Sequence, residues 1–351
     1  MKIKAVIVAG GTGGHINAAL SLGECLSVEK YDVLFITGTR HLDYALFKNT
    51  NCIHLNTMPL RYKNPLKILK SLVFNLAVFF NLIINFIKQR PAFVIGCGGY
   101  VCGPTLMAAY LLRIPFYIVE QNAVMGLTNK LLSYTANKIF LHFKNTKGLK
   151  PFMKGKIIIS GNPTRQSIKY STEKKGKTYN VLVFGGSLGA LQVNRIIGEL
   201  IKSDSDVSLH IIHQVGKGNK FEQRVGKNIK YEQHEYLDNM QDYYDWCNLI
   251  VSRAGASTIS ELRIVQRASI LIPFPHATDN HQYYNALNLK EEVAFPVYLL
   301  GQEDSIETNC SKLKNIIIDL VNDHSPVSNG QTLFIHDSAK VIIDEIKIDI
   351  A

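Results

Sequence analysis

Short runs of apolar residues alternate along the chain with longer segments in which apolar residues recur every three or four positions. In the first half, the short runs fall at residues 4–9, 32–36, 52–55, 93–95, 116–119 and 138–141. Runs of this kind, separated by helical periodicity, are typical of βαβ units, in which helices connect the parallel strands of one sheet. The first half is therefore predicted to be an α/β domain.

The same pattern starts again after Gly161-Asn162-Pro163 and a lysine-rich stretch at residues 169–177. Its apolar runs lie at residues 181–184, 209–212, 248–251, 269–272 and 296–299. The sequence thus predicts two doubly wound, Rossmann-like domains, whose ligands bind beyond the carboxyl ends of the strands. We place the N-terminal domain at residues 1–162 and the C-terminal domain at 163–332. A final helix, in residues 333–351, is expected to pack back on the N-terminal domain.

Composition narrows the class of protein. A length of 351 residues suits two domains, and 46% hydrophobic with 19% charged residues excludes a disordered chain. The net charge of +11 suits a polyanion or an anionic membrane surface without choosing between them. Six scattered cysteines are typical of a reducing cytoplasm. Neither a secretory leader nor a spanning helix is expected, because the first apolar run ends in glycines and no charge-free run reaches about 20 residues.

Three glycine-rich turns follow predicted strands, at residues 10–14, 96–103 and 185–189. A single turn of this kind can be only a tight connection, but three at strand ends favour phosphate binding by backbone N–H groups. The dinucleotide fingerprint fails, because Ile16 stands where the third glycine is required, and the sequence has no P-loop. We therefore expect a diphosphate ligand, such as a nucleotide sugar.

Several polar residues are candidates for the chemistry, each with a purely structural alternative. His15 follows the first turn, where it could take a proton from a sugar hydroxyl or merely cap the helix. Glu261, one turn into the helix predicted after residues 253–258, could bind ribose hydroxyls or complete a capping box. Gln282 and Asn285, one helical turn apart, could bind sugar hydroxyls or face solvent.

The segment at residues 61–90 suggests contact with a membrane. Residues 71–87 form a 17-residue stretch without charge, flanked by Lys63, Lys67, Lys70, Lys88 and Arg90. As a helix it is about 25 Å long, shorter than the ~30 Å hydrocarbon core. We expect most of its side chains to cover the sheet, and part of it to dock on an anionic membrane surface.

The motifs together closely resemble the MurG family of glycosyltransferases. The matches keep their order over most of the chain, and they lie at residues 9–15, 98–104, 120–122, 126–130, 161–165, 185–190, 252–261, 273–276 and 282–286. The resemblance implies a GT-B architecture, with two Rossmann-like domains facing an interdomain cleft. It implies an inverting transfer of N-acetylglucosamine (GlcNAc) from UDP-GlcNAc to the 4-hydroxyl of undecaprenyl-diphosphate-MurNAc-pentapeptide (lipid I). The product would be lipid II of peptidoglycan synthesis.

The resemblance also implies a place and roles for individual residues. The enzyme would work at the cytoplasmic face of the bacterial plasma membrane, as a peripheral protein. From the residues themselves, the basic apolar segment adds anionic lipids to the expected partners, and no motif supports nucleic acid. No metal or other cofactor is expected, because the sequence has no paired carboxylates near the glycine turns. His15 would be the catalytic base. The donor would be bound by Thr12, Gly13, Gly14, Asn122, Arg165, Ser187, Leu237, Ala256, Ser257, Thr258, Glu261 and Gln282. The acceptor diphosphate would be bound by Gly13, Gly14, Gly98, Gly99, Tyr100 and Gly103.

Three other interpretations remain open from the sequence. The first is another UDP-sugar enzyme of the same architecture, such as a glycolipid synthase or a UDP-GlcNAc epimerase. The second is a non-catalytic protein that keeps a nucleotide-sugar pocket. The third, a nucleic-acid binder, rests on the charge alone and has no supporting motif.

Overall fold

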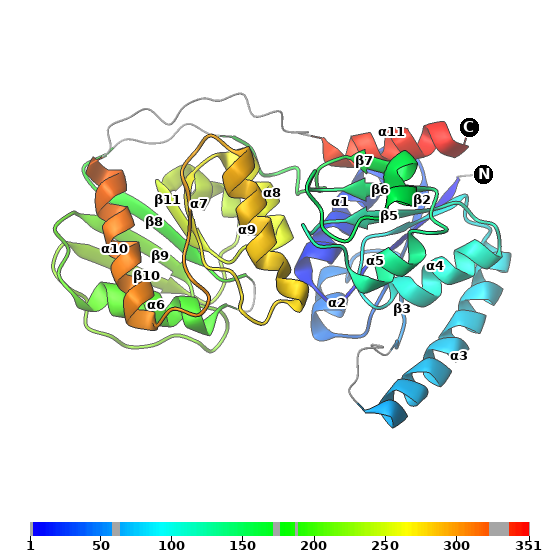
Figure 1. The fold of residues 1–351 in the computed structure, drawn as a ribbon, viewed down its shortest axis with the longest axis horizontal. Helices are drawn as coiled ribbons and strands as arrows, with labels where there is room; N and C mark the ends of the chain where they lie inside the picture. Colours follow the sequence, from blue (N-terminus) through cyan, green and yellow to red (C-terminus); the bar gives the residue numbers. More distant parts are fainter. Residues whose placement is uncertain (1–2, 58–63, 171–175, 187–188, 323–336, 351) are drawn as a thin grey trace. The chain divides into compact units, whose positions relative to one another are not determined.

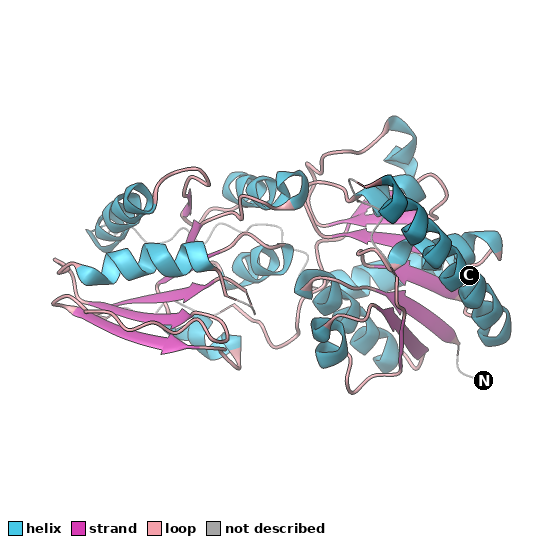
Figure 2. Cartoon of the chain, turned by 90° about the horizontal axis from the view of Figure 1, so that it is seen from below, coloured by secondary structure: helices cyan, strands magenta, loops and turns pink. Residues whose placement is uncertain are grey.

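The computed structural model describes residues 3–57, 64–170, 176–186, 189–322 and 337–350. The chain divides into two compact units (Figure 1). Unit 1 consists of Met1–Arg165 together with Ile335–Ala351, and unit 2 consists of Gln166–Phe334. Each unit contains one parallel sheet, and Figure 2 shows helices on both sides of each sheet.

Unit 1 has a seven-stranded sheet with the order β3-β2-β1-β4-β5-β6-β7. Its strands are β1 (Lys4–Val8), β2 (Asp32–Thr37), β3 (Cys52–His54), β4 (Phe93–Gly96), β5 (Phe116–Glu120), β6 (Lys138–Leu141) and β7 (Ile157–Ile159). Its helices are α1 (Gly13–Val28), α2 (His41–Leu46), α3 (Pro65–Gln89), α4 (Cys102–Leu111), α5 (Leu127–Leu132), the 3₁₀ helix η1 (Pro151–Lys156) and α11 (Ser338–Ile350).

Alternate residues of these strands pack into two cores, one on each face of the sheet. Val6 and Val8 belong to a cluster with residues of α3, α4 and α5. Ala5 and Ile7 belong to a second cluster with residues of α1 and α11. This arrangement explains why β1 is apolar from Ala5 to Val8, since both of its faces are buried there.

The last helix, α11, is part of unit 1 although it comes last in the chain. Its residues Ile342, Ile343 and Ile346 are buried in the second cluster. The Tyr117 hydroxyl donates to Asp349 Oδ2 at 2.7 Å. Lys138 Nζ forms an ion pair with Glu345 Oε2 at 2.9 Å. Apolar burial and polar contacts together thus fix α11 on the sheet.

Helix α3 departs from the expectation that most of its side chains cover the sheet. Among those described, Ser71, Leu82 and Phe86 are buried. Large apolar side chains are exposed on Leu66, Leu69, Val73, Phe74, Leu76, Phe80, Ile84 and Ile87. The N-terminal part of the helix extends away from the rest of unit 1 (Figure 1). The expectation was wrong because it is the C-terminal half of the helix, with Leu82 and Phe86, that packs into the first cluster.

By length and composition alone, α3 is also sufficient to cross a membrane. Its best 18-residue window has a mean hydropathy of 1.8, and 12% of that window is buried. The prediction from the sequence counted only charge-free residues, whereas the helix continues into its flanking lysines. At about 1.5 Å per residue it is about 37 Å long.

Unit 2 repeats the architecture with six strands in the order β10-β9-β8-β11-β12-β13. The strands are β8 (Tyr179–Phe184), β9 (Leu209–Gln214), β10 (Ile229–His234), β11 (Leu249–Ser252), β12 (Ala268–Leu271) and β13 (Val297–Leu299). Its helices are α6 (Leu191–Lys202), α7 (Met240–Trp246), α8 (Ala256–Val265), the 3₁₀ helix η2 (Thr278–Asn280), α9 (His281–Glu292) and α10 (Ile306–Asn322). Helices α6 and α10 share one core with the sheet.

Two strands were not predicted from the sequence, and both lie at a sheet edge. β7 is an isoleucine triplet whose side chains are partly exposed. β10 reads Ile-Lys-Tyr-Glu-Gln-His and is only partly buried. β10 was missed because its apolar and polar residues alternate, and β7 because its apolar run is only three residues long.

Candidate functional site

Three neighbouring strands of unit 1 end at the same edge of the sheet. β2, β1 and β4 are adjacent, with Val8 paired to both Ile36 and Gly96. Because the carboxyl ends of parallel strands share one edge, the first two glycine turns lie together there. Residues 38–43, which follow β2, join them, although no sequence motif marks this segment.

His15 is oriented by backbone groups of both turns. The Thr12 hydroxyl accepts from the His15 N–H at 3.4 Å and caps α1. His15 Nδ1 lies 3.2 Å from the Gly10 carbonyl oxygen. A carbonyl can only accept, so Nδ1 carries the proton in this contact and Nε2 carries a lone pair. A Cβ added to Gly98 would come within 2.9 Å of Nε2, which shows how closely the ring lies against the second turn.

The second glycine turn needs its glycines for a steric reason. Gly98 and Gly99 have φ values of +103° and +91°. A Cβ on Gly99 would lie 2.3 Å from the Gly10 carbonyl oxygen. The Gly10 N–H donates to the Gly98 carbonyl at 3.3 Å, so the two turns are joined through their backbones. At Gly13, by contrast, an added Cβ would meet no atom within 4 Å.

The buried thiol of Cys102 contacts the backbone of the same turn. Its Sγ lies 3.2 Å from the Gly98 N–H and 3.3 Å from the Val8 carbonyl. Burial raises the pKa of this thiol to about 12. The group is therefore a neutral packing and hydrogen-bonding element and not a nucleophile.

Asp43 and Arg40, at the start of α2, form hydrogen bonds with Gly11 of the first turn. The fully buried Asp43 carboxylate accepts from the Gly11 N–H at 3.1 Å and from the Arg40 N–H at 3.0 Å. Arg40 Nη1 donates to the Gly11 carbonyl at 3.3 Å, and its guanidinium lies 5.0 Å from the centre of the Tyr100 ring. Burial raises the pKa of Tyr100, and the charge of Arg40 partly offsets that rise.

Asn122 is held by a buried carboxylate at the end of β5. Glu120 is 2% exposed and accepts from the Asn122 N–H at 3.1 Å and from its side-chain amide at 3.4 Å. The same carboxylate accepts from the Gly126 N–H at 2.9 Å and from the Asn129 amide at 2.9 Å. Glu120 thus organises the 120–129 segment, a role that its place in the motif did not reveal.

In unit 2, a buried glutamine connects the third glycine turn to Leu237. Gln214, at the end of β9, donates to the Gly186 carbonyl at 2.8 Å and accepts from the Leu237 N–H at 2.9 Å. The Leu237 N–H is therefore already used within the protein. Ser187, the predicted diphosphate ligand of this turn, lies outside the described residues.

Helix α8 carries four more of the predicted donor residues of unit 2. Ala256, Ser257 and Thr258 form its first turn, whose N–H groups have no partner within the helix. Glu261 accepts a hydrogen bond from the Tyr244 hydroxyl at 2.6 Å. Tyr244 is fully buried, so it fixes one carboxylate oxygen of a side chain that remains partly exposed.

Arg253, which follows β11 just before α8, forms hydrogen bonds with the segment that follows β12. Its Nη1 donates to the carbonyls of Ile272 and Pro273 at 2.9 and 3.0 Å, and to Gln192 Oε1 at 3.0 Å. Burial lowers the pKa of this guanidinium to about 10. Arg253 therefore has a structural role, which its place in the motif did not reveal.

The two amides of α9 differ in their environment. Gln282 is partly exposed, and its Oε1 accepts from the Phe274 N–H at 2.9 Å. Asn285 is fully buried and donates to the Ala254 carbonyl at 3.1 Å, so it cannot bind a sugar hydroxyl as considered from the sequence. Arg165 is exposed and is the last residue of the first segment of unit 1.

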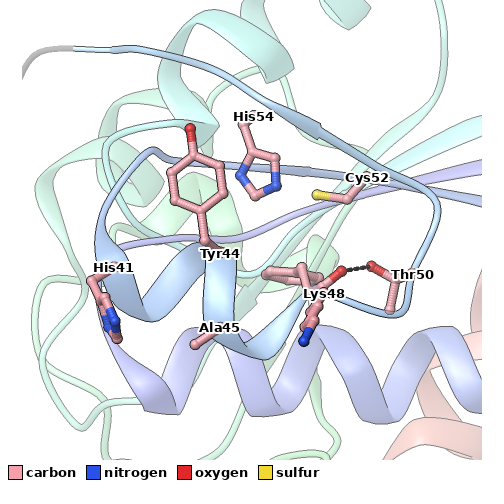
Figure 3. Close-up of a pocket in the computed structure, with 8 residues that line it drawn as sticks. His41, Tyr44, Ala45, Lys48, Thr50, Cys52 and His54 are labelled. Atoms are coloured by element: carbon pink, nitrogen blue, oxygen red, sulfur yellow. Dashed lines mark hydrogen bonds between the residues drawn. The ribbon is translucent and has the colours of Figure 1, made fainter.

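A depression of about 550 Å³ lies between α2 and β3 (Figure 3). Its walls carry His41, Tyr44, Lys48, Cys52 and His54. The rings of Tyr44 and His54 are stacked with their centroids 4.1 Å apart. Among the described residues, no group of three or more His, Cys, Asp or Glu side chains is placed to hold a metal ion.

Comparison with known proteins gives the same family for both halves. Residues 5–141 match the model of the glycosyltransferase family 28 N-terminal domain, and residues 180–332 match the C-terminal domain of that family. The chain is 35% identical to the UDP-N-acetylglucosamine–N-acetylmuramyl-(pentapeptide) pyrophosphoryl-undecaprenol N-acetylglucosamine transferase of Rickettsia bellii, over 93% of each chain. It is 37% identical to the protein of the same name from Myxococcus xanthus, over 81% of this chain and 77% of that one.

Solved structures agree with this relationship. The crystal structure of Acinetobacter baumannii MurG matches with a TM-score of 0.74 and 27% identity, covering 98% of this chain and 99% of that one. The UDP-GlcNAc 2-epimerase of Neisseria meningitidis matches with a TM-score of 0.60 at 12% identity, a likeness of fold alone. With its two parallel-sheet units and both family 28 domains, the chain belongs to the MurG family of GT-B glycosyltransferases.

Proposed function

We propose that the chain works by a single displacement at the anomeric carbon of the donor sugar, with inversion, and that His15 accepts the proton of the attacking hydroxyl. As a MurG-family enzyme, the chain transfers GlcNAc from UDP-GlcNAc to lipid I and so forms lipid II for peptidoglycan synthesis. The observation that carries the role of His15 is the contact of its Nδ1 with the Gly10 carbonyl oxygen. The Nδ1 contact with Gly10 leaves the lone pair on Nε2, beside the turn proposed to hold the acceptor.

The acceptor diphosphate is bound by backbone N–H groups of unit 1, at Gly13, Gly14 and the 98–103 turn with Tyr100 and Gly103. Two features support this assignment. The space in front of Gly13 is open, and the first N–H groups of the 16-residue helix α1 point to where an anion is stabilised. Thr12, Gly13 and Gly14 also contact the donor sugar when it reaches the acceptor hydroxyl.

The donor UDP is bound by unit 2. The first turn of α8, Ala256 to Thr258, binds the diphosphate together with Ser187 and Arg165, and Glu261 binds the ribose through the oxygen opposite its contact with Tyr244. Because Gln214 occupies the Leu237 N–H, the carbonyl of Leu237 accepts from the N–H of uracil. Asn122 and Gln282 bind GlcNAc hydroxyls through their side-chain amides, which are oriented by Glu120 and by the Phe274 N–H.

Catalysis follows from where charge develops. The leaving UDP gains negative charge on its diphosphate, so N–H and guanidinium donors aimed there stabilise the transition state more than the ground state. The reaction as proposed needs no metal ion. On the acceptor side, proton removal by His15 increases the nucleophilicity of the hydroxyl as the new bond forms.

The exposed apolar side chains of α3 dock on the cytoplasmic face of the plasma membrane, where the lipid acceptor resides. Lys67, Lys70 and Lys88 are exposed on the same helix and attract anionic lipids, whereas Lys63 lies outside the described residues. A protein docked in this way is peripheral and keeps unit 1 next to its substrate.

The test is transfer of labelled GlcNAc from UDP-GlcNAc to a muramyl-pentapeptide on a prenyl diphosphate. His15→Ala should lower kcat by about 10²–10⁴-fold, while binding of UDP-GlcNAc, measured by titration calorimetry, stays unchanged. A two- or threefold drop would remove the general-base role. Conversion of UDP-GlcNAc to an epimer without any acceptor would instead show that the epimerase alternative is right.

A further inference from the structure

The guanidinium of Arg40 touches both glycine turns of unit 1. It donates from Nη1 to the Gly11 carbonyl at 3.3 Å and lies over the Tyr100 ring at 5.0 Å. Arg40 is exposed, and it stands at the carboxyl end of β2, next to the ends of β1 and β4. A positive charge is therefore held where the two turns meet.

Asp43 determines the position of that charge without neutralising it through an ion pair. Its two carboxylate oxygens accept from the backbone N–H groups of Gly11 and Arg40, and Oδ1 also lies 3.3 Å from the Thr37 hydroxyl. Across the described parts of the chain, no ion pair joins Arg40 to a carboxylate. The N–H of Gly11 is thus held by Asp43 and its carbonyl by Arg40.

An arginine in this setting is suited to a phosphate ligand. The planar guanidinium has five N–H donors, one of which binds the Gly11 carbonyl, and it pairs with phosphate oxygens in a fork geometry. The aromatic ring of Tyr100 restricts its rotamers, which reduces the entropy lost on binding. The buried Asp43 would repel an approaching anion, so Arg40 also screens a negative charge that the turn needs for its structure.

We propose that Arg40 binds the diphosphate of the lipid acceptor, and that Asp43 is a positioning residue that fixes Arg40 and Gly11 for this contact. The proposal rests on the acceptor site described under the proposed function. The same guanidinium chemistry would also suit the donor diphosphate or the carboxylates of the acceptor peptide, and the experiment separates these three sources.

The experiment compares Arg40→Gln with Arg113→Gln, a matched control at the exposed amino end of β5. Steady-state kinetics with each substrate varied in turn should show an acceptor KM raised about 10–100-fold in Arg40→Gln, the loss expected for charge-assisted hydrogen bonds. The KM for UDP-GlcNAc should change less than twofold, and Arg113→Gln should match the wild type. Arg40→Lys should recover part of the acceptor affinity, because it restores the charge without the fork.

Inorganic diphosphate serves as the probe for the chemical group. At saturating UDP-GlcNAc it should inhibit the wild type in competition with the acceptor, and Arg40→Gln should weaken that inhibition at least fivefold. An unchanged acceptor KM overturns the proposal, as does a rise in the UDP-GlcNAc KM of the same size, which would assign Arg40 to the donor. A raised acceptor KM with unchanged inhibition by diphosphate overturns it in favour of the peptide carboxylates.

The failure of this inference can be told apart from a failure of the proposed function. If the wild type transfers no sugar to the lipid acceptor, the proposed function fails, and calorimetry of inorganic diphosphate with wild type and Arg40→Gln still tests the site. Thermal melting checks folding, since the Arg40 side chain is exposed and its replacement should shift the melting temperature only slightly.

Discussion

A pair of glycine substitutions separates the two reasons for which the turns of unit 1 contain glycine. Gly99→Ala places a methyl group 2.3 Å from the Gly10 carbonyl oxygen, in a residue whose φ is +91°. Gly13→Ala adds the same methyl group where no atom lies within 4 Å, at the first residue of α1. The first substitution should damage the fold, and the second should damage only ligand binding.

The magnitudes follow from these two environments. For Gly99→Ala, the left-handed backbone costs about 1–2 kcal/mol and the overlap with Gly10 about 1–3 kcal/mol. A total of about 3 kcal/mol lowers the melting temperature of a unit of this size by about 6–12 °C. Gly13→Ala is compatible with helical φ and ψ, so it should leave stability unchanged or raise it by about 0.5 kcal/mol.

The two assays are thermal unfolding followed by circular dichroism, and GlcNAc transfer with the acceptor varied. Gly13→Ala should melt at or slightly above the wild-type temperature, yet lose about 10–100-fold in kcat/KM for the acceptor because its methyl group occupies the space of a phosphate oxygen. Wild-type activity of Gly13→Ala would refute the placement of a phosphate at this turn. A Gly99→Ala protein as stable as the wild type would refute the steric reasoning.

Two further predictions concern the membrane helix and the interior of unit 2. Replacing Lys67, Lys70 and Lys88 by Glu should weaken binding to anionic vesicles at least tenfold, and 0.5 M salt should weaken wild-type binding in the same assay, because screening acts on exposed charges; binding that survives both changes would exclude the electrostatic contribution. Burial lowers the pKa of His213 to about 3, from about 6.5 in the unfolded chain. On acidification, His213 therefore binds a proton in the unfolded state at a higher pH than in the folded state. The free energy of unfolding of unit 2 should fall between about pH 6 and pH 4, by up to about 1.4 kcal/mol per pH unit. Denaturant unfolding checks this, and His213→Gln should flatten the slope; an equal slope in both proteins would show that other groups cause it.

The central strands and glycine turns could be predicted from the sequence because their signals are local. β1 is apolar on both faces and is followed closely by glycines, a pattern typical of a buried strand that leads into a sharp turn. The two-domain α/β architecture and the GT-B family were confirmed. The edge strands were missed because β10 alternates apolar and polar residues and β7 has an apolar run of only three residues.

The supporting residues of the site could not be predicted from a local pattern. Asp43 acts on Gly11, 32 residues away, and Gln214 joins Gly186 to Leu237 across separate segments. Nothing near Asp43 in the sequence marks it as buried, since a carboxylate in a short helix is ordinarily exposed. Its role depends on β2 and β1 being neighbours, and only the sheet order supplies that information.

The assembly of unit 1 from both ends of the chain has a consequence for biosynthesis. During translation, all of unit 2 is made before α11 leaves the ribosome. The face of the first sheet that carries Tyr117 and Phe140 therefore stays uncovered until Ile342 and Ile346 have been synthesised. Until then the nascent chain exposes an aggregation-prone apolar surface, which holdase chaperones can bind. A premature stop codon a few residues upstream of Ser338 would therefore destabilise unit 1, which begins at the N-terminus, and would leave unit 2 intact.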